Sequence, residues 1–259
     1  MTEGVLSYES KTHPLRLDDE GPGFFDRQFN GSPTQPQIIF DVIVGVVMPI
    51  ICLVFDPIVF RQGRYGSAIM APYAALAYSA VALQGVGLIA WIATRACPTF
   101  FAGLLTVGFF IALGFAVPLV PISIMGLIVI IGVLGFTPWF TAFTFLRNAN
   151  RALVASRSKS ENGWLASLAG FVLALAIPCC VQLYVNIAVE DAVLQVMSGK
   201  PTDVVEGTRT LRQLSFMIDP KAITGRIDGD RLTQSHIDRL AQAYRDVTGR
   251  TYGEDSWDD

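Results

Sequence analysis

The middle of this chain contains no ionic side chains. From residue 96 to residue 146, a run of fifty-one residues lacks Lys, Arg, Asp, Glu and His. A helix needs about 20 apolar residues to cross a bilayer, so the run is long enough for two crossings. Pro118 and Pro121 lie near its centre, where each removes a backbone donor from the helical hydrogen-bond ladder. The sequence therefore predicts a transmembrane hairpin with spans at 100–117 and 122–146.

Histidine and cysteine are also scarce. The two histidines, His13 and His236, lie outside the apolar runs, which excludes paired imidazoles as ligands of a haem or a metal inside the membrane. The four cysteines lie in or beside apolar runs and none follows Cys180, a distribution unlike that of a disulfide framework. The adjacent Cys179 and Cys180 are typical of small buried side chains, with soft-metal binding, redox chemistry and acylation as alternatives.

Catalytic and nucleotide-binding motifs are missing as well. The chain has no Gly-Lys-Ser/Thr phosphate loop, no Gly-x-Ser-x-Gly nucleophile elbow and no His-Glu-x-x-His motif. The acidic turn at 228–230 begins like a calcium loop, but Leu232, Thr233 and Arg239 stand where an EF-hand requires an acid or Asn, then Gly, then Glu. A net charge of −3 offers no basic surface to a nucleic acid. We therefore expect no catalytic residue, no cofactor, no metal and no nucleic-acid partner, and these absences favour a non-enzymatic protein over an enzyme.

What the chain does contain is a high proportion of apolar residues. They make up 52% of the sequence, against 16% charged residues, a balance typical of several spans joined by short loops. We predict an all-α fold, a polytopic transmembrane helical bundle of about five spans with a small helical C-terminal extramembrane region. The expected parts are an irregular acidic N-terminal tail (1–37), a transmembrane domain (38–189) with spans at 38–60, 67–94, 100–117, 122–146 and 164–189, and the C-terminal region (190–259).

Two carboxylates lie at membrane depth in the first predicted span, Asp41 and Asp56. Such carboxylates are costly and often border an ion path or a proton relay. Asp56 lies five residues before Arg61, so pairing with Arg61 or Arg64 at the headgroup boundary is the main alternative, and Asp41 lies near the opposite boundary. Fifteen residues of helix separate the two carboxylates by about 22 Å, which disfavours a catalytic dyad. The other candidates for a polar path are Gln84, Gln182 and Asn186.

Small residues at four-residue spacing predict two helix faces for close packing. The first face consists of Ala71, Ala75 and Ser79, and the second of Ala166, Gly170 and Ala174.

Basic residues indicate the orientation in the membrane. The loop after the fourth predicted span carries Arg147, Arg151, Arg157 and Lys159, which we assign to orientation, with binding of anionic lipid headgroups as an alternative. This distribution favours a cytoplasmic N-terminus and a C-terminus on the opposite side. The acidic tail before the first span predicts an uncleaved anchor rather than a cleaved signal.

The C-terminal region is predicted to form two helices, at about 202–216 and 233–248, with Gly249 as a left-handed cap of the second. One face of the second helix is apolar and is expected to dock on the membrane domain, a second copy or a partner. This face consists of Ile237, Leu240, Tyr244 and Val247.

Three functional hypotheses follow from these features. The first is a non-enzymatic accessory or scaffolding subunit of a membrane complex, in contact with membrane lipids and with other subunits or further copies of itself. The second is a small transporter or channel that uses Asp56 beside a polar path. The third is a membrane enzyme acting on lipid or isoprenoid substrates, for which the only polar interfacial cluster is Arg147, Asn148, Asn150 and Arg151.

Overall fold

The structure is a computed structural model that describes residues 29, 33–53, 73–117, 136–157, 163–218, 223, 232–249 and 251–252. All secondary-structure elements in these ranges are helices: α2 (Gln35–Val42), the π-helical turn η1 (Ile43–Val47), α4 (Ala74–Thr94), α5 (Pro98–Ala116), α8 (Thr137–Arg157), α9 (Trp164–Ser198), α10 (Pro201–Leu214) and α12 (Gln234–Thr248). The all-α prediction is confirmed for the described part of the chain.

Four helices in the described ranges are long and apolar enough to cross a membrane. They are the continuous helix Gln35–Leu53, which contains α2 and η1, and the helices α4, α5 and α9. These lengths and compositions are compatible with an integral membrane protein.

Local sequence signals explain where several of these helices begin and end. Before α2, the backbone N–H of Thr34 donates to the Gln37 side chain at 3.1 Å, as in a capping box. Helix α4 ends at Thr94 because Arg95 adopts a left-handed conformation with φ of 50°. Helix α5 begins at Pro98, since a proline in the first turn forfeits no helical hydrogen bond.

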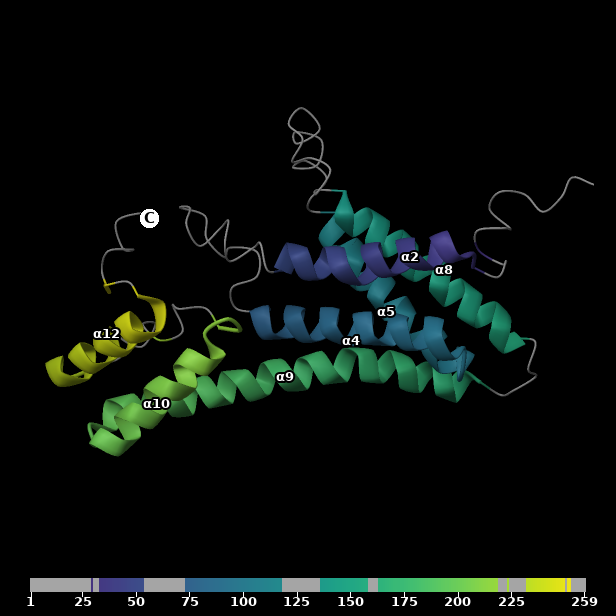
Figure 1. The fold of residues 1–259 in the computed structure, drawn as a ribbon. Coiled ribbons are helices and arrows are strands. Elements are labelled where there is room, and N and C mark those ends of the chain that lie inside the picture. The colour runs from purple at the N-terminus through teal and green to yellow at the C-terminus, as the bar shows by residue number, and fades with distance from the viewer. Residues whose placement is uncertain are drawn as a thin grey trace, which may run out of the picture.

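Helix α5 is the centre of the bundle. It packs against α8, α9 and α4, while α4 and α9 lie side by side (Figure 1). The segment formed by α2 and η1 lies across α8 and also contacts α4. One end of α9 extends beyond α4, and α10 and α12 pack there.

Glycines allow α5 and α9 to approach closely. A Cβ atom added at Gly103 of α5 would collide with the backbone oxygen of Ser167, and one added at Gly170 of α9 would collide with the backbone oxygen of Phe100. Ala174, one turn further along α9, is also buried. The two backbones therefore meet where neither helix carries a large side chain.

The predicted small-residue faces are placed as follows. Gly170 and Ala174 are buried, whereas Ala166 is exposed. In α4, Ala75 is fully buried and Ser79 is half-buried, with the Ser79 hydroxyl donating to the Ala75 carbonyl at 2.7 Å. Ala71 lies outside the described residues.

Two helices continue beyond the spans that the sequence predicts. The fourth predicted span stops at Leu146, but α8 continues to Arg157. The fifth stops at Val189, but α9 continues to Ser198, where α10 covers it. By contrast, α4 ends at Thr94 as predicted. Three parts of the predicted spans lie outside the described residues, namely 54–60, 67–72 and 122–135. The expected turn at Pro118 and Pro121 also lies outside them.

The two C-terminal helices lie close to their predicted ranges. Gly249 follows α12 in the left-handed conformation expected of it, with φ of 73°. Both helices pack on the last turns of α9, and their position outside the membrane stays a prediction. The side chains at the centre of this contact are Val193, Val196, Leu211, Leu240 and Tyr244.

Large apolar side chains are exposed around the bundle. On α9, Leu183 and Tyr184 are 60% and 69% exposed, and Ile39 of α2 is 59% exposed. Water-soluble proteins rarely expose continuous apolar surface of this kind, whereas hydrocarbon solvates it. The surface therefore supports a membrane environment for α2 and α9.

Candidate functional site

The most polar part of the bundle interior is a cluster around Asp41. This aspartate lies in the last turn of α2 and is 1% exposed. Its partners come from α8, where Thr144, Arg147, Asn148 and Arg151 are all buried. Residues at these spacings share one face of a helix, so α8 turns a polar stripe towards α2.

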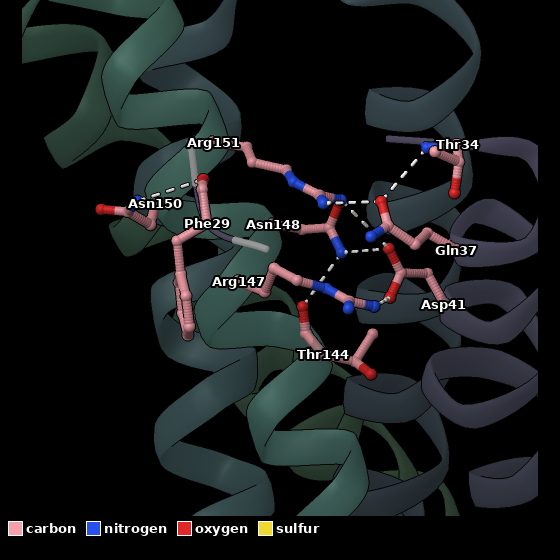
Figure 2. Close-up of polar contacts among 9 residues, drawn as sticks. All are labelled: Phe29, Thr34, Gln37, Asp41, Thr144, Arg147, Asn148, Asn150 and Arg151. Atoms are coloured by element: carbon pink, nitrogen blue, oxygen red, sulfur yellow. Dashed lines mark hydrogen bonds and ion pairs between the residues drawn. The ribbon is translucent and has the colours of Figure 1, made fainter. Parts of the chain in front are cut away.

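Direct contacts occupy both carboxylate oxygens of Asp41 (Figure 2). Arg147 Nη2 donates to Asp41 Oδ1. Asn148 Nδ2 donates to Asp41 Oδ2 at 2.9 Å and to the Thr144 carbonyl at 3.0 Å. Arg151 Nη1 lies 3.6 Å from Asp41 Oδ2. One carboxylate therefore holds three side chains of α8.

Gln37 extends the cluster towards the start of α2. Its Oε1 atom accepts a hydrogen bond from Arg151 Nη2 at 3.1 Å and another from the backbone N–H of Thr34 at 3.1 Å (Figure 2). The same amide oxygen therefore caps α2 and fixes the guanidinium of Arg151, which couples the beginning of α2 to the end of α8.

Aromatic rings pack against the guanidinium of Arg147. Its Cζ atom lies 5.8 Å from the ring centroid of Phe40 and 5.4 Å from that of Phe143. Phe29 meets Phe143 edge to face at 5.5 Å, and its carbonyl accepts a hydrogen bond from Asn150 at 3.3 Å. These rings shield the ion pair and interact favourably with its cation.

The helix type changes two residues after Asp41, at Ile43. The backbone widens to the π-helical turn η1, a feature that often occurs at functional positions. The hydroxyl of Thr141 on α8 donates to the Val44 carbonyl at 2.9 Å inside this turn. Gly45 lies against Leu88 of α4, since an added Cβ would be 2.5 Å from Leu88 Cδ2. The turn is therefore joined to both neighbouring helices.

The charges of the cluster explain why Asp41 is stable in the interior. A single buried charge costs several kcal/mol, and pairing with hydrogen bonding offsets that cost. Here one carboxylate faces two guanidinium groups and an amide. An Arg guanidinium stays protonated and is not a nucleophile, and the Asp41 oxygens are already occupied. The arrangement is therefore suited to joining α2 to α8 rather than to acid–base or nucleophilic chemistry.

The other predicted polar residues lie in separate places. Gln182 Oε1 accepts a hydrogen bond from the backbone N–H of Leu76 in the first turn of α4, at 2.9 Å, and Gln182 Nε2 donates to Asn186 at 2.8 Å. This pair therefore caps α4 from α9. Gln84 lies in α4, in the wall of a cavity described below. Asp56 lies outside the described residues.

The basic residues predicted to lie in one loop occupy different environments in the structure. Arg147 and Arg151 lie inside the bundle on Asp41, and Arg157 is exposed at the end of α8. Lys159 lies outside the described residues. For these four basic residues, the roles in orientation and in headgroup binding stay predictions. Arg147 and Arg151 have a further role, because their contacts with Asp41 join α8 to α2.

Sequence analysis missed the pairing of Asp41 with Arg147. The two residues are 106 positions apart, and the sequence alone predicts Asp41 at the membrane boundary. A usable signal was present, because Arg147, Asn148 and Arg151 repeat at helical spacing directly after an apolar run. Such a stripe needs a buried partner of opposite charge, and Asp41 is a carboxylate inside a span.

Cysteines and acids are dispersed in the described ranges. Cys52 is half-buried, and Cys97, Cys179 and Cys180 are exposed, so the expectation that Cys179 and Cys180 are buried is wrong. No group of three or more His, Cys, Asp or Glu side chains suited to a metal ion occurs among the described residues.

Compared with known proteins, the chain matches no family model, no curated protein and no solved structure.

Proposed function

We propose that this protein is a non-enzymatic accessory or scaffolding subunit of a membrane complex. The observation that carries the proposal is the use of its interior polar groups. Asp41 joins α2 to α8, Thr141 joins α8 to η1, and Gln182 joins α9 to α4. Polar side chains at membrane depth thus build a bundle with fixed helix positions, which is the property a scaffold needs.

The peripheral helices supply the surface for lipids and subunits. In both Gln35–Leu53 and α9, only 17% of the most apolar window is buried inside the chain. A helix that packs so little against its own chain turns most of its circumference outwards. Membrane lipids cover this surface, and a second membrane protein competes with them where packing is better.

The apolar face of α12 is already used inside the chain. Leu240 and Tyr244 are buried against α9 and α10, and Val247 packs at the edge of the same cluster, with Ile237 half-buried. For the contact with a soluble part of a partner, we instead assign the apolar side chains that α10 and its end leave exposed. They are Val205 and Phe216, which are 70% and 53% exposed.

Purification in native lipid nanodiscs tests the proposal. The tagged chain is expected to be isolated with a second polypeptide at a fixed ratio, as measured by native mass spectrometry. The double variant Val205→Ser/Phe216→Ser is expected to lose most of that companion. Glu206→Gln, on the same exposed helix, is the matched control and should retain it.

The opposite result would be a nanodisc that contains one copy of the chain and no companion, with the double variant indistinguishable from the wild type. The transporter hypothesis rests on Asp56, which lies outside the described residues, while Gln182 and Asn186 are hydrogen-bonded to each other and Gln84 lies in a cavity wall. We therefore do not advance it as a second function.

A further inference from the structure

A partly open cavity borders Thr141, which lies one turn of α8 before Thr144 of the Asp41 cluster. Its volume is about 170 Å³, and η1 with the turns after it, α4, α5 and α8 all contribute to its wall. Its wall includes Ala80, Gln84, Gly108, Phe115 and Phe145.

The wall is almost entirely apolar, and its polar side chains are Gln84, Thr137 and Thr141. Gln84 is 3% exposed, and neither its Nε2 nor its Oε1 atom has a hydrogen-bond partner among the described residues. A buried amide without partners is destabilising, and unpaired groups of this kind are rare in folded proteins. Both the N–H donors and the carbonyl acceptor of this side chain are therefore available to a bound molecule.

The position of the Gln84 amide is defined by its neighbours. A Cβ atom added at Gly108 of α5 would lie 2.5 Å from Gln84 Oε1 and 3.0 Å from a ring carbon of Phe145. The amide thus lies on the glycine and beside an aromatic ring, in the cavity wall. A side chain at position 108 would occupy the space that the amide now uses.

The size of the cavity selects the class of ligand. An apolar cavity of about 150 Å³ holds one benzene ring, so about 170 Å³ accommodates one substituted ring. A water molecule would satisfy the amide but leave most of the apolar volume empty. A ring with a hydroxyl group fills the volume, donates to Gln84 Oε1 and packs against Phe115 and Phe145.

We propose that this cavity is a binding site for a single aromatic ring carrying a hydroxyl group, recognised by the amide of Gln84. Such a ring reaches the site either as a free phenol or as the headgroup of a membrane quinol. The proposal is independent of the accessory role, because it concerns the interior of the bundle and not the surface presented to a partner.

Fluorine NMR of the full-length protein in nanodiscs tests the site with two probes of similar size. 4-Fluorophenol is expected to bind saturably, and 4-fluorotoluene, which lacks the hydroxyl, is expected to bind at least about tenfold more weakly, the value of one hydrogen bond. Gln84→Leu should weaken the binding of fluorophenol by about tenfold and change the affinity for fluorotoluene by no more than about twofold. Gln213→Leu makes the same change at an exposed position of α10. It should alter the affinity for neither probe.

A variant whose larger side chain fills the cavity provides a second test of the site. Ala80 is buried in the wall, so Ala80→Leu is expected to abolish binding of both probes. The proposal is overturned if fluorophenol only partitions without saturation, or if its affinity is unchanged in either Gln84→Leu or Ala80→Leu. A hydroquinone with an alkyl tail identifies the source. Displacement of fluorophenol by the tailed compound supports a membrane quinol, and displacement only by tailless hydroquinone supports a free phenol; both results support the hydroxylated ring.

Discussion

Asp41 is stable in the interior because of the groups that surround it. Its carboxylate receives the guanidinium of Arg147 and the amide of Asn148, with Arg151 3.6 Å away. A buried ion pair is weak as a source of net stability, because desolvation of both charges opposes their attraction. Loss of one partner is different, since it leaves the other charge buried without compensation.

Replacement of the carboxylate alone should therefore be strongly destabilising. We expect Asp41→Asn to lower the free energy of unfolding by about 3–5 kcal/mol, because Arg147 then stays buried opposite a neutral amide. Reversible denaturation of the purified protein in mixed micelles measures the change. The double variant Asp41→Asn/Arg147→Gln should cost less than the sum of the two single variants.

An exposed ion pair provides the control for this prediction. Glu206 and Arg209 lie 3.7 Å apart on α10, with side chains 64% and 68% exposed. Glu206→Gln should change the free energy of unfolding by less than about 0.5 kcal/mol. Strict additivity of the Asp41 and Arg147 variants would show that the two side chains do not interact.

The pairing also shows how far reasoning from the sequence extends. Composition alone placed Asp41 inside an apolar helix and Arg147 at the end of another. Which helices are neighbours depends on packing over 106 positions of chain, and local patterns contain no such information. Gln84 was found as a polar residue in a span, but the cavity beside it exists only through four converging segments.

Helix contacts in this bundle depend on shape as much as on polarity. At the crossing of α5 and α9, Gly103 lies on the backbone of Ser167 and Gly170 on the backbone of Phe100. A flexible side chain can move aside for a new methyl group, whereas a helix backbone moves only with its whole helix. The crossing is therefore intolerant of any Cβ atom.

A single methyl group should be enough to disturb this contact. We expect Gly103→Ala to lower the free energy of unfolding by about 1–3 kcal/mol through overpacking. Gly114→Ala is the control on the same helix, because nothing lies within 4 Å of an added Cβ there, and it should be neutral or stabilising by up to about 1 kcal/mol. The same micelle denaturation measures both, and equal values would contradict the close crossing.

Periodicity and capping signals predicted some helices better than others. Helix α12 agrees with its prediction within a residue or so because an amphipathic repeat and Gly249 define it locally. The end of α9 lies beyond the predicted span, which stops at Val189. The helix continues since Val193 and Val196 are buried by α10 and α12, a tertiary cause that has no local signal.

The length of α9 relates the helical bundle to the membrane. At about 1.5 Å per residue, its 35 residues extend about 52 Å, well beyond the roughly 30 Å of the hydrocarbon core. Its first residues lie beside the turn between α4 and α5, since a Cβ added at Gly163 would be 2.5 Å from Thr99. Its last turns carry α10 and α12 (Figure 1). The α4–α5 turn and the C-terminal helices should therefore face opposite sides of the membrane.

Cysteine labelling in sealed vesicles tests this arrangement with a native thiol. Cys97 is exposed in the α4–α5 turn, so a variant that retains Cys97 and lacks the other three cysteines reports that side. A variant without native cysteines but with Ser235→Cys, an exposed position on α12, reports the other. A membrane-impermeant maleimide is expected to label only one of the two before lysis and both after it. Labelling of both thiols in intact vesicles of one orientation would mean that α9 does not cross the membrane, because its two ends would then share a compartment.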